Sequence, residues 1–185
     1  MTIDDLTEAI GVDASRYSLA RTDYNSPVDI DLNLLASHSN ENPVYYVQYA
    51  HARSCNVDRN AAAAGITYDG ADVSLLDTVA DGEVLAALAQ WPALLREAGD
   101  LRAPHRVAHY LEDLAATYHK WYNVERVVPM ALTDPEARGE DAEAVRIAKA
   151  PEPARAAARL KLNDAVRTVI AEGLDLLGVT APDRM

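Results

Sequence analysis

Aromatic and cationic side chains are concentrated in two short segments, residues 45–59 and 118–126. Planar rings can stack on unpaired nucleic-acid bases, and guanidinium groups can bind the neighbouring phosphates, at roughly 1–3 kcal/mol for each stacked base. Tyr46, Tyr49 and Arg53 recur at a helical spacing that places them on one face. Alternatively, the tyrosines fill the core of a chain without phenylalanine, and the spacing alone leaves both interpretations open. The residues concerned are Tyr45, Tyr46, Tyr49, Tyr118, Trp121 and Tyr122, with Gln48, Arg53, Arg59 and Arg126 near them.

The sequence shows no recognisable enzyme active site. It lacks a phosphate-binding glycine loop, a dinucleotide-binding glycine pattern, a nucleophile-elbow serine and a zinc-protease histidine pair. His105 and His109 are four residues apart, but without a cysteine to help them, packing or surface roles are favoured over a metal site. His51 and His119 have no nucleophile beside them, which favours structural hydrogen bonding over general-base catalysis. We therefore expect no catalytic residue and no metal site.

Length and composition predict one soluble domain. A chain of 185 residues can bury a sizeable core, and a hydrophobic content of 49% argues against disorder. The apolar runs are shorter than the roughly 20 residues that a transmembrane helix needs, and the acidic N-terminus MTIDDLTEAI does not resemble a signal peptide. The single cysteine, Cys55, excludes a disulfide framework and a zinc cluster built from cysteines. We expect a cytoplasmic protein without a membrane attachment.

The net charge of −12 argues against broad nucleic-acid binding, because non-specific affinity comes from cations that neutralise phosphates. The charge is uneven, however. Residues 1–90 hold 4 basic and 14 acidic side chains, whereas residues 91–185 hold 13 and 15. Any binding of RNA must therefore use local basic and aromatic patches and should be weak.

Helical periodicity dominates the sequence, and no stretch shows convincing two-residue alternation. We therefore predict an all-α bundle of about five main helices. Asn42-Pro43 is a strong start signal for a helix that continues to Ala64 and stops at Gly65. Other helices are predicted at Thr2–Ala9 with a stop at Gly11, from about Asp13, after Asp29 or Asp31, from Asp81 or Gly82 with a bend at Pro92, from Pro104, and from Pro153 to Leu177.

Three segments of the sequence resemble segments of one protein family, and they occur in the same order as in that family. The string NENPVYYVQYAHARSCNVDRNA closely resembles the helix that opens the anticodon-binding domain of arginyl-tRNA synthetases. GVDASRYSLARTDYNSPVDIDLNLL resembles the segment that leads out of their catalytic core, and LKLNDAVRTVIAEGLDLLGVTAPDRM resembles their closing helix and terminus. The match covers nearly the whole chain and is weakest at residues 60–81 and 133–153. It implies a class Ia, DALR-type helical domain at residues 29–185, with residues 1–28 linking it to a catalytic core.

The resemblance also implies a function. Enzymes of this family activate arginine with ATP, for which we expect Mg²⁺, and transfer it to their cognate tRNA. Their HIGH-like and KMSK-like motifs lie upstream of the matching segment and do not occur here. The chain is therefore expected to bind the anticodon stem-loop of tRNA(Arg) and to dock on the catalytic core, without a cofactor and without catalysis of its own.

Five residues match positions that the family uses at the anticodon. Tyr46 and Tyr49 match loop-facing tyrosines of the opening helix, and Arg59 matches a basic residue farther along it. Tyr122, in the string HKWYNV, matches an aromatic residue that is presented to an anticodon base. Met185 matches the residue that closes against the same loop. The neighbours expected in the core are Val44, Tyr45 and Val47.

Two other interpretations stay open. One is the related helical domain of other class Ia synthetases, such as the cysteinyl enzymes, although the YYVQYAHAR string and the Pro-Asp-Arg-Met end argue against it. The other is a structural or protein-docking bundle. Exposure distinguishes docking from RNA binding: if Tyr46, Tyr49 and Tyr122 are all buried and lie apart, docking is favoured.

Overall fold

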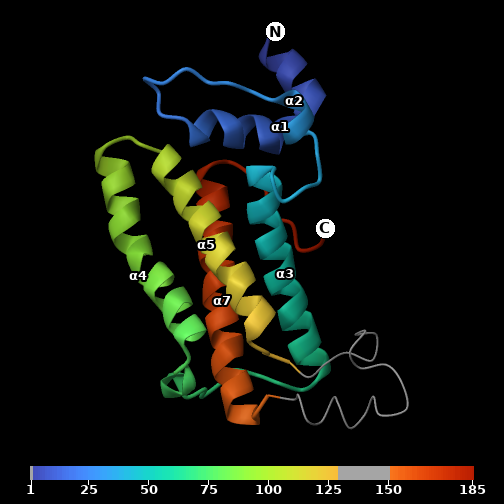
Figure 1. Cartoon of the computed structure of the whole chain (residues 1–185), viewed down its shortest axis with the longest axis vertical. Helices are drawn as coiled ribbons and strands as arrows, with labels where there is room; N and C mark the ends of the chain where they lie inside the picture. The colour runs from blue at the N-terminus through green and yellow to red at the C-terminus, as the bar shows by residue number, and fades with distance from the viewer. Residues whose placement is uncertain (1, 129–150) are drawn as a thin grey trace.

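The computed structural model describes residues 2–128 and 151–185, and within these ranges every regular element is helical. Four long helices lie alongside one another, and α1 lies across one end of them (Figure 1). The all-α prediction with about five main helices is confirmed. The elements are α1 (Ile3–Arg21), α2 (Leu32–Leu35), α3 (Pro43–Ala63), the 3-10 helix η1 (Val73–Leu75), α4 (Val79–Asp100), α5 (His105–Val124) and α7 (Pro153–Leu176). Most of the weakly matching segment 133–153 lies outside the described residues.

Helix α3 begins where the sequence predicts. The Asn42 side chain accepts a hydrogen bond from the backbone N–H of Tyr45 and donates to the carbonyl oxygens of Leu35 and Ser37, at 2.9 and 2.8 Å. Proline occupies the first helical position, where its missing N–H costs no hydrogen bond. The buried Asn42 therefore both starts α3 and ties it to the end of α2.

One predicted helix stop is confirmed and one helix start differs. Within α1 two helical segments meet at a kink at Gly11, where the sequence predicts the first to stop, and the φ of 82° at this residue is costly for other residues. Helix α4 begins at Val79, earlier than predicted, because Thr78 is its N-cap. Asp81 is the third helical residue and completes the capping box by accepting from the Thr78 N–H. The predicted start at Asp81 or Gly82 is therefore wrong by two or three residues, although Asp81 does belong to the first turn.

Helix α5 supplies much of the core and approaches α7 closely. Leu111, Leu114, Tyr118 and Trp121 of α5 are almost completely buried. A Cβ atom added to Gly173 of α7 would lie 2.6 Å from Leu111 Cδ2, so a larger residue here would force the buried Leu111 side chain to shift. The glycine therefore allows α5 and α7 to pack closely at this point.

A buried polar cluster joins α4, α5 and α7. Trp121 Nε1 donates to Asp81 Oδ1 at 2.7 Å, and the Asp81 side chain is fully buried. Arg159 Nε lies 3.5 Å from Asp81 Oδ1, and its guanidinium also pairs with Glu125. Buried charges are tolerated where they are paired and hydrogen-bonded. The cluster therefore holds the end of α5 against α4 and α7.

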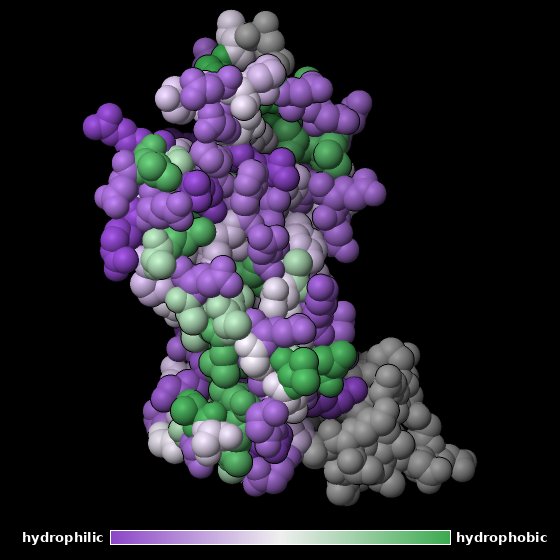
Figure 2. Space-filling model, turned by 60° about the vertical axis from the view of Figure 1, so that its left-hand side comes forward, coloured by the Kyte–Doolittle hydropathy of each residue, from purple (hydrophilic) through white to green (hydrophobic). Residues whose placement is uncertain are grey.

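On the side of the bundle where α4 lies, the surface is mainly hydrophilic in its upper half and gathers hydrophobic residues in its lower half (Figure 2). The exposed hydrophobic side chains of η1 and of the first half of α4 are Val73, Val79 and Leu85. Among the described helices, none combines the length and the apolar character needed to span a membrane.

Candidate nucleic-acid interface

The C-terminal tail, residues 178–185, follows one stripe of α3. Gln48 Nε2 donates to the Thr180 carbonyl oxygen at 2.9 Å, and His51 Nδ1 lies 2.9 Å from the Pro182 carbonyl oxygen. Farther along the same stripe, Cys55 contacts the Asp183 carboxylate and Arg59 Nη1 donates to the Asp183 carbonyl oxygen. These contacts place the last two residues of the tail beside the middle of α3. The four α3 residues of the stripe are Gln48, His51, Cys55 and Arg59.

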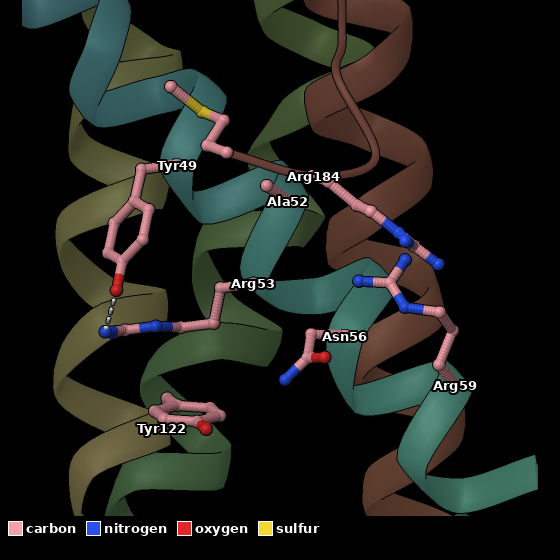
Figure 3. A pocket seen from close by; sticks show the side chains of 8 residues that line it. Tyr49, Ala52, Arg53, Asn56, Arg59, Tyr122 and Arg184 are labelled. Carbon is pink, nitrogen blue, oxygen red and sulfur yellow. Dashed lines mark hydrogen bonds between the residues drawn. The ribbon is translucent and has the colours of Figure 1, made fainter. Parts of the chain in front are cut away.

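An open depression of about 530 Å³ lies between α3, the last turn of α5 and the tail (Figure 3). Helix α3 contributes most of its lining, α5 contributes one aromatic ring, and the tail contributes its last two side chains. No acidic side chain lines it in the described part of the chain, although the chain as a whole is strongly acidic. The lining residues are Tyr49, Ala52, Arg53, Asn56, Arg59, Tyr122, Arg184 and Met185.

The Arg53 guanidinium lies between two tyrosine rings. Its Cζ atom is 4.7 Å from the centre of the Tyr49 ring and 4.5 Å from the centre of the Tyr122 ring. Nη2 also donates to the Tyr49 hydroxyl at 3.0 Å, as the dashed line in Figure 3 shows. A cation over the face of an aromatic ring is attracted by its quadrupole. Tyr122, with 36% of its surface exposed, is therefore held in place while part of its ring stays accessible.

His119 fixes Arg53 from inside the bundle. Its Nδ1 accepts a hydrogen bond from Arg53 Nη1 at 2.8 Å, which requires the unprotonated nitrogen at this position. Burial and the nearby Arg53 charge lower the pKa of His119 to about 4. The imidazole is thus neutral at physiological pH. Its hydrogen bond helps to hold the Arg53 guanidinium between the rings of Tyr49 and Tyr122.

We expect His119 to make the fold less stable in mild acid. The pKa of His119 is an ordinary 6.5 in the unfolded chain and about 4 in the folded chain, so between these pH values the unfolded chain binds a proton that the folded chain does not. The contribution of His119 to the unfolding free energy is therefore complete above pH 6.5 and is lost as the pH falls toward 4. His119→Asn keeps an acceptor near the Nδ1 position and cannot titrate. Between about pH 7 and about pH 4.5, the wild type should lose about 1–2 kcal/mol more unfolding free energy than the variant, the full shift being reduced by partial solvent contact.

Urea unfolding at several pH values measures this difference. The other four histidines are common to both proteins, so their contributions cancel. Parallel pH profiles for the wild type and His119→Asn would contradict the proposed neutral state of His119.

Arg59 and Arg184 form the cationic side of the depression. Arg59 comes from α3 and Arg184 from the tail, and both line the depression, which Tyr122 also borders (Figure 3). Guanidinium groups bind phosphates through charge-assisted hydrogen bonds, so two arginines around one hollow are suited to contacting a phosphate. A second depression of about 500 Å³, lined in part by Asn60, Asn123 and Val128, shares Tyr122 with the first. The ring of Tyr122 therefore stands at the border between two hollows.

Four of the five residues predicted at the site come together here: Tyr49, Arg59, Tyr122 and Met185. The structure places Tyr46 elsewhere. Its half-buried ring packs 4.8 Å from the His119 ring, burial raises the pKa of its hydroxyl, and it borders a different hollow. Tyr46 therefore does not line the depression. It packs against His119, the residue that positions Arg53.

Asn56 and Arg184 also line the depression but were not singled out from the sequence, whereas Arg53, which the helical spacing placed beside Tyr49, was not among the five residues matched to the family. Tyr49, Arg53 and Asn56 follow an i, i+4, i+7 spacing, so the helical period could have assigned all three to one face. Of the expected core neighbours, Val44 and Val47 are buried. Tyr45 is only half-buried and stacks between His38 and Tyr49, at 5.5 and 6.1 Å between ring centres.

A partly exposed aromatic ring beside arginines combines the two features with which proteins bind single-stranded nucleic acid, stacking of bases and contact with phosphates. The chain belongs to the DALR anticodon binding domain family, whose family model matches residues 47–185. Over its full length it is 94% identical to an arginine–tRNA ligase of Bifidobacterium adolescentis and 52% identical to one of Kineococcus radiotolerans. It spans 31% and 30% of these relatives, respectively.

The fold agrees with these relatives. The solved structure of Thermus thermophilus arginyl-tRNA synthetase superposes with a TM-score of 0.70 at 28% identity, covering the whole chain and 28% of that protein. The structure of arginyl-tRNA synthetase from Plasmodium falciparum superposes on the whole chain with the same TM-score at 17% identity, and the match covers 29% of that protein. At this level of identity the similarity shows the fold alone. The expected resemblance to the anticodon-binding domain of arginyl-tRNA synthetases is confirmed, and the matching regions are parts of longer ligases.

Proposed function

We propose that this chain binds the anticodon loop of an arginine tRNA and positions that tRNA for ATP-dependent arginylation by a synthetase catalytic core. The observation that carries the proposal is the partly exposed Tyr122 ring, stacked on Arg53 at the border of two hollows. ATP and Mg²⁺ belong to the catalytic core in this proposal. Residues 1–28 would lead from that core into the helical domain.

The geometry supports a specific binding mode. A splayed base stacks on the accessible part of the Tyr122 ring, which Arg53 and Tyr49 keep in a fixed orientation. Arg59 and Arg184 bind the adjacent phosphates, and the exposed Met185 side chain covers the apolar edge of the base. A ring that is already ordered loses little conformational entropy on binding, which favours affinity.

Exposure favours RNA over protein docking at this site. Tyr122 is exposed and Tyr49 is half-buried, and both border the same polar depression, so the condition that would favour docking is not met. Three arginines around one hollow are better suited to a phosphate backbone than to an apolar protein surface.

The proposal predicts selective, salt-sensitive binding of an arginine anticodon stem-loop. Local contacts must overcome the net charge of −12, so affinity should be modest and should fall steeply as salt rises from about 50 to about 200 mM. Fluorescence anisotropy with labelled stem-loops measures this. The control RNA keeps the same stem and carries the anticodon of another amino acid.

We expect the arginine stem-loop to bind more tightly than the control at every salt concentration. Equal affinity for both RNAs, or tight binding to random RNA that does not change with salt, would overturn the proposed function.

A further inference from the structure

Three side chains able to bind a metal ion meet where the tail crosses α3. They are His51 and Cys55, one helical turn apart, and Asp183 of the tail. One nitrogen, sulfur or oxygen atom of each lies within 4.8 Å of the others. His51 and Cys55 are buried, whereas Asp183 is exposed. The cluster is separate from the depression, although Asp183 immediately precedes Arg184 and Met185, which line it.

The imidazole of His51 is oriented as in a metal ligand. Its Nδ1 lies 2.9 Å from the Pro182 carbonyl oxygen, and because a carbonyl only accepts, Nδ1 carries the proton. The lone pair is then on Nε2. Cys55 Sγ lies 3.9 Å from Nε2 and 3.8 Å from Nδ1, so it is about equally distant from the two ring nitrogens. Histidines that bind metals commonly donate their other ring N–H to a backbone carbonyl, which fixes the tautomer and the ring.

The distances suit a tetrahedral ion. Zn–S and Zn–N bonds of about 2.3 and about 2.0 Å at a tetrahedral angle separate the two ligand atoms by about 3.5 Å. Cys55 Sγ lies 3.9 Å from His51 Nε2 and 3.5 Å from Asp183 Oδ1, and a change of the Cys55 or His51 rotamer is needed to bring Sγ toward the Nε2 lone pair. The exposed side of Asp183 leaves room for a water molecule as the fourth ligand.

We propose that His51, Cys55 and Asp183 bind one Zn²⁺ ion, with solvent in the fourth position. A mixed nitrogen, sulfur and oxygen set is typical of Zn²⁺ and needs only one cysteine. Binding transfers the thiol proton of Cys55 to solvent and forms the Zn–S bond. The ion joins α3 to the residue before Arg184 and so holds the tail against the bundle.

Cobalt titration of the 185-residue chain tests the proposal, because a Co²⁺–thiolate bond gives a charge-transfer absorption band in the near ultraviolet. We expect this band to saturate at one equivalent of Co²⁺ and to disappear when Zn²⁺ is added. Cys55→Ser should abolish the band. Asp183→Asn, at an exposed position that the fold tolerates, should weaken Co²⁺ binding by more than about tenfold.

His109→Ala is the matched control, since His105 and His109 are the other histidine pair at helical spacing, with ring centres 6.2 Å apart. This variant should keep the band unchanged. Absence of a charge-transfer band in the folded wild type, or equal Co²⁺ affinity in the wild type and Asp183→Asn, would overturn the metal site. Neither result depends on RNA binding.

Discussion

Replacing Tyr122 with alanine should weaken binding of the arginine anticodon stem-loop by about 5- to 150-fold, the equivalent of about 1–3 kcal/mol for one lost stacked base. The ring is 36% exposed and lies 4.5 Å from the Arg53 guanidinium, so the substitution removes both the stacking surface and the group that Arg53 contacts. Fluorescence anisotropy measures the change in Kd, and circular dichroism checks that the helices are intact.

Two control variants separate stacking from other effects. Tyr122→Phe keeps the ring and should retain nearly all of the affinity. Tyr24→Ala removes a tyrosine that is 86% exposed in the connection between α1 and α2, away from the lining of the depression, and should bind as the wild type does. An affinity that is unchanged in Tyr122→Ala, with the helical content preserved, would exclude Tyr122 as the stacking platform.

Asp81→Ala should destabilise the fold by about 3–5 kcal/mol, the cost typical of removing one partner from a buried ion pair. The substitution leaves Trp121 Nε1 without its acceptor and Arg159 with one fewer anionic partner, in a cluster where both side chains are buried. It also removes the Asp81 half of the capping box at the start of α4. Chemical denaturation monitored by circular dichroism measures the loss.

Asp77→Ala is the matched control for this prediction. Asp77 also pairs with an arginine of α7, Arg155, but its side chain is 60% exposed. Exposed ion pairs contribute little because solvent screens them, so this variant should remain close to the wild type. Similar destabilisation by both substitutions would show that burial does not set the importance of Asp81.

Much of the helical fold could be predicted because the signals are local. Asn42-Pro43 and Gly65 mark the two ends of α3 through capping and backbone preferences that depend on a few neighbouring residues. The start of α4 shows the limit of such signals. Thr78 and Asp81 are both good capping residues, and only the formed capping box distinguishes the N-cap from the third helical position.

The site was harder to predict because its parts are distant in sequence. Period alone places Tyr46 and Arg53 on the same face of α3 as Tyr49, but it does not show which of them α5 covers. His119 of α5 packs against Tyr46 and leaves Tyr49 and Arg53 at the depression. The path of the tail depends on contacts between residues 124–132 positions apart, for which the sequence carries no local signal.

The path of the tail along α3 has a thermodynamic consequence for recognition. Terminal residues are usually poorly ordered, and ordering them only when a ligand arrives would reduce its affinity. Here Gln48, His51 and Arg59 hold the tail before any ligand binds, so most of its loss of conformational freedom occurs during folding. Arg184 and Met185 then meet a ligand as part of a preorganised surface, and more of their contact energy is retained as affinity.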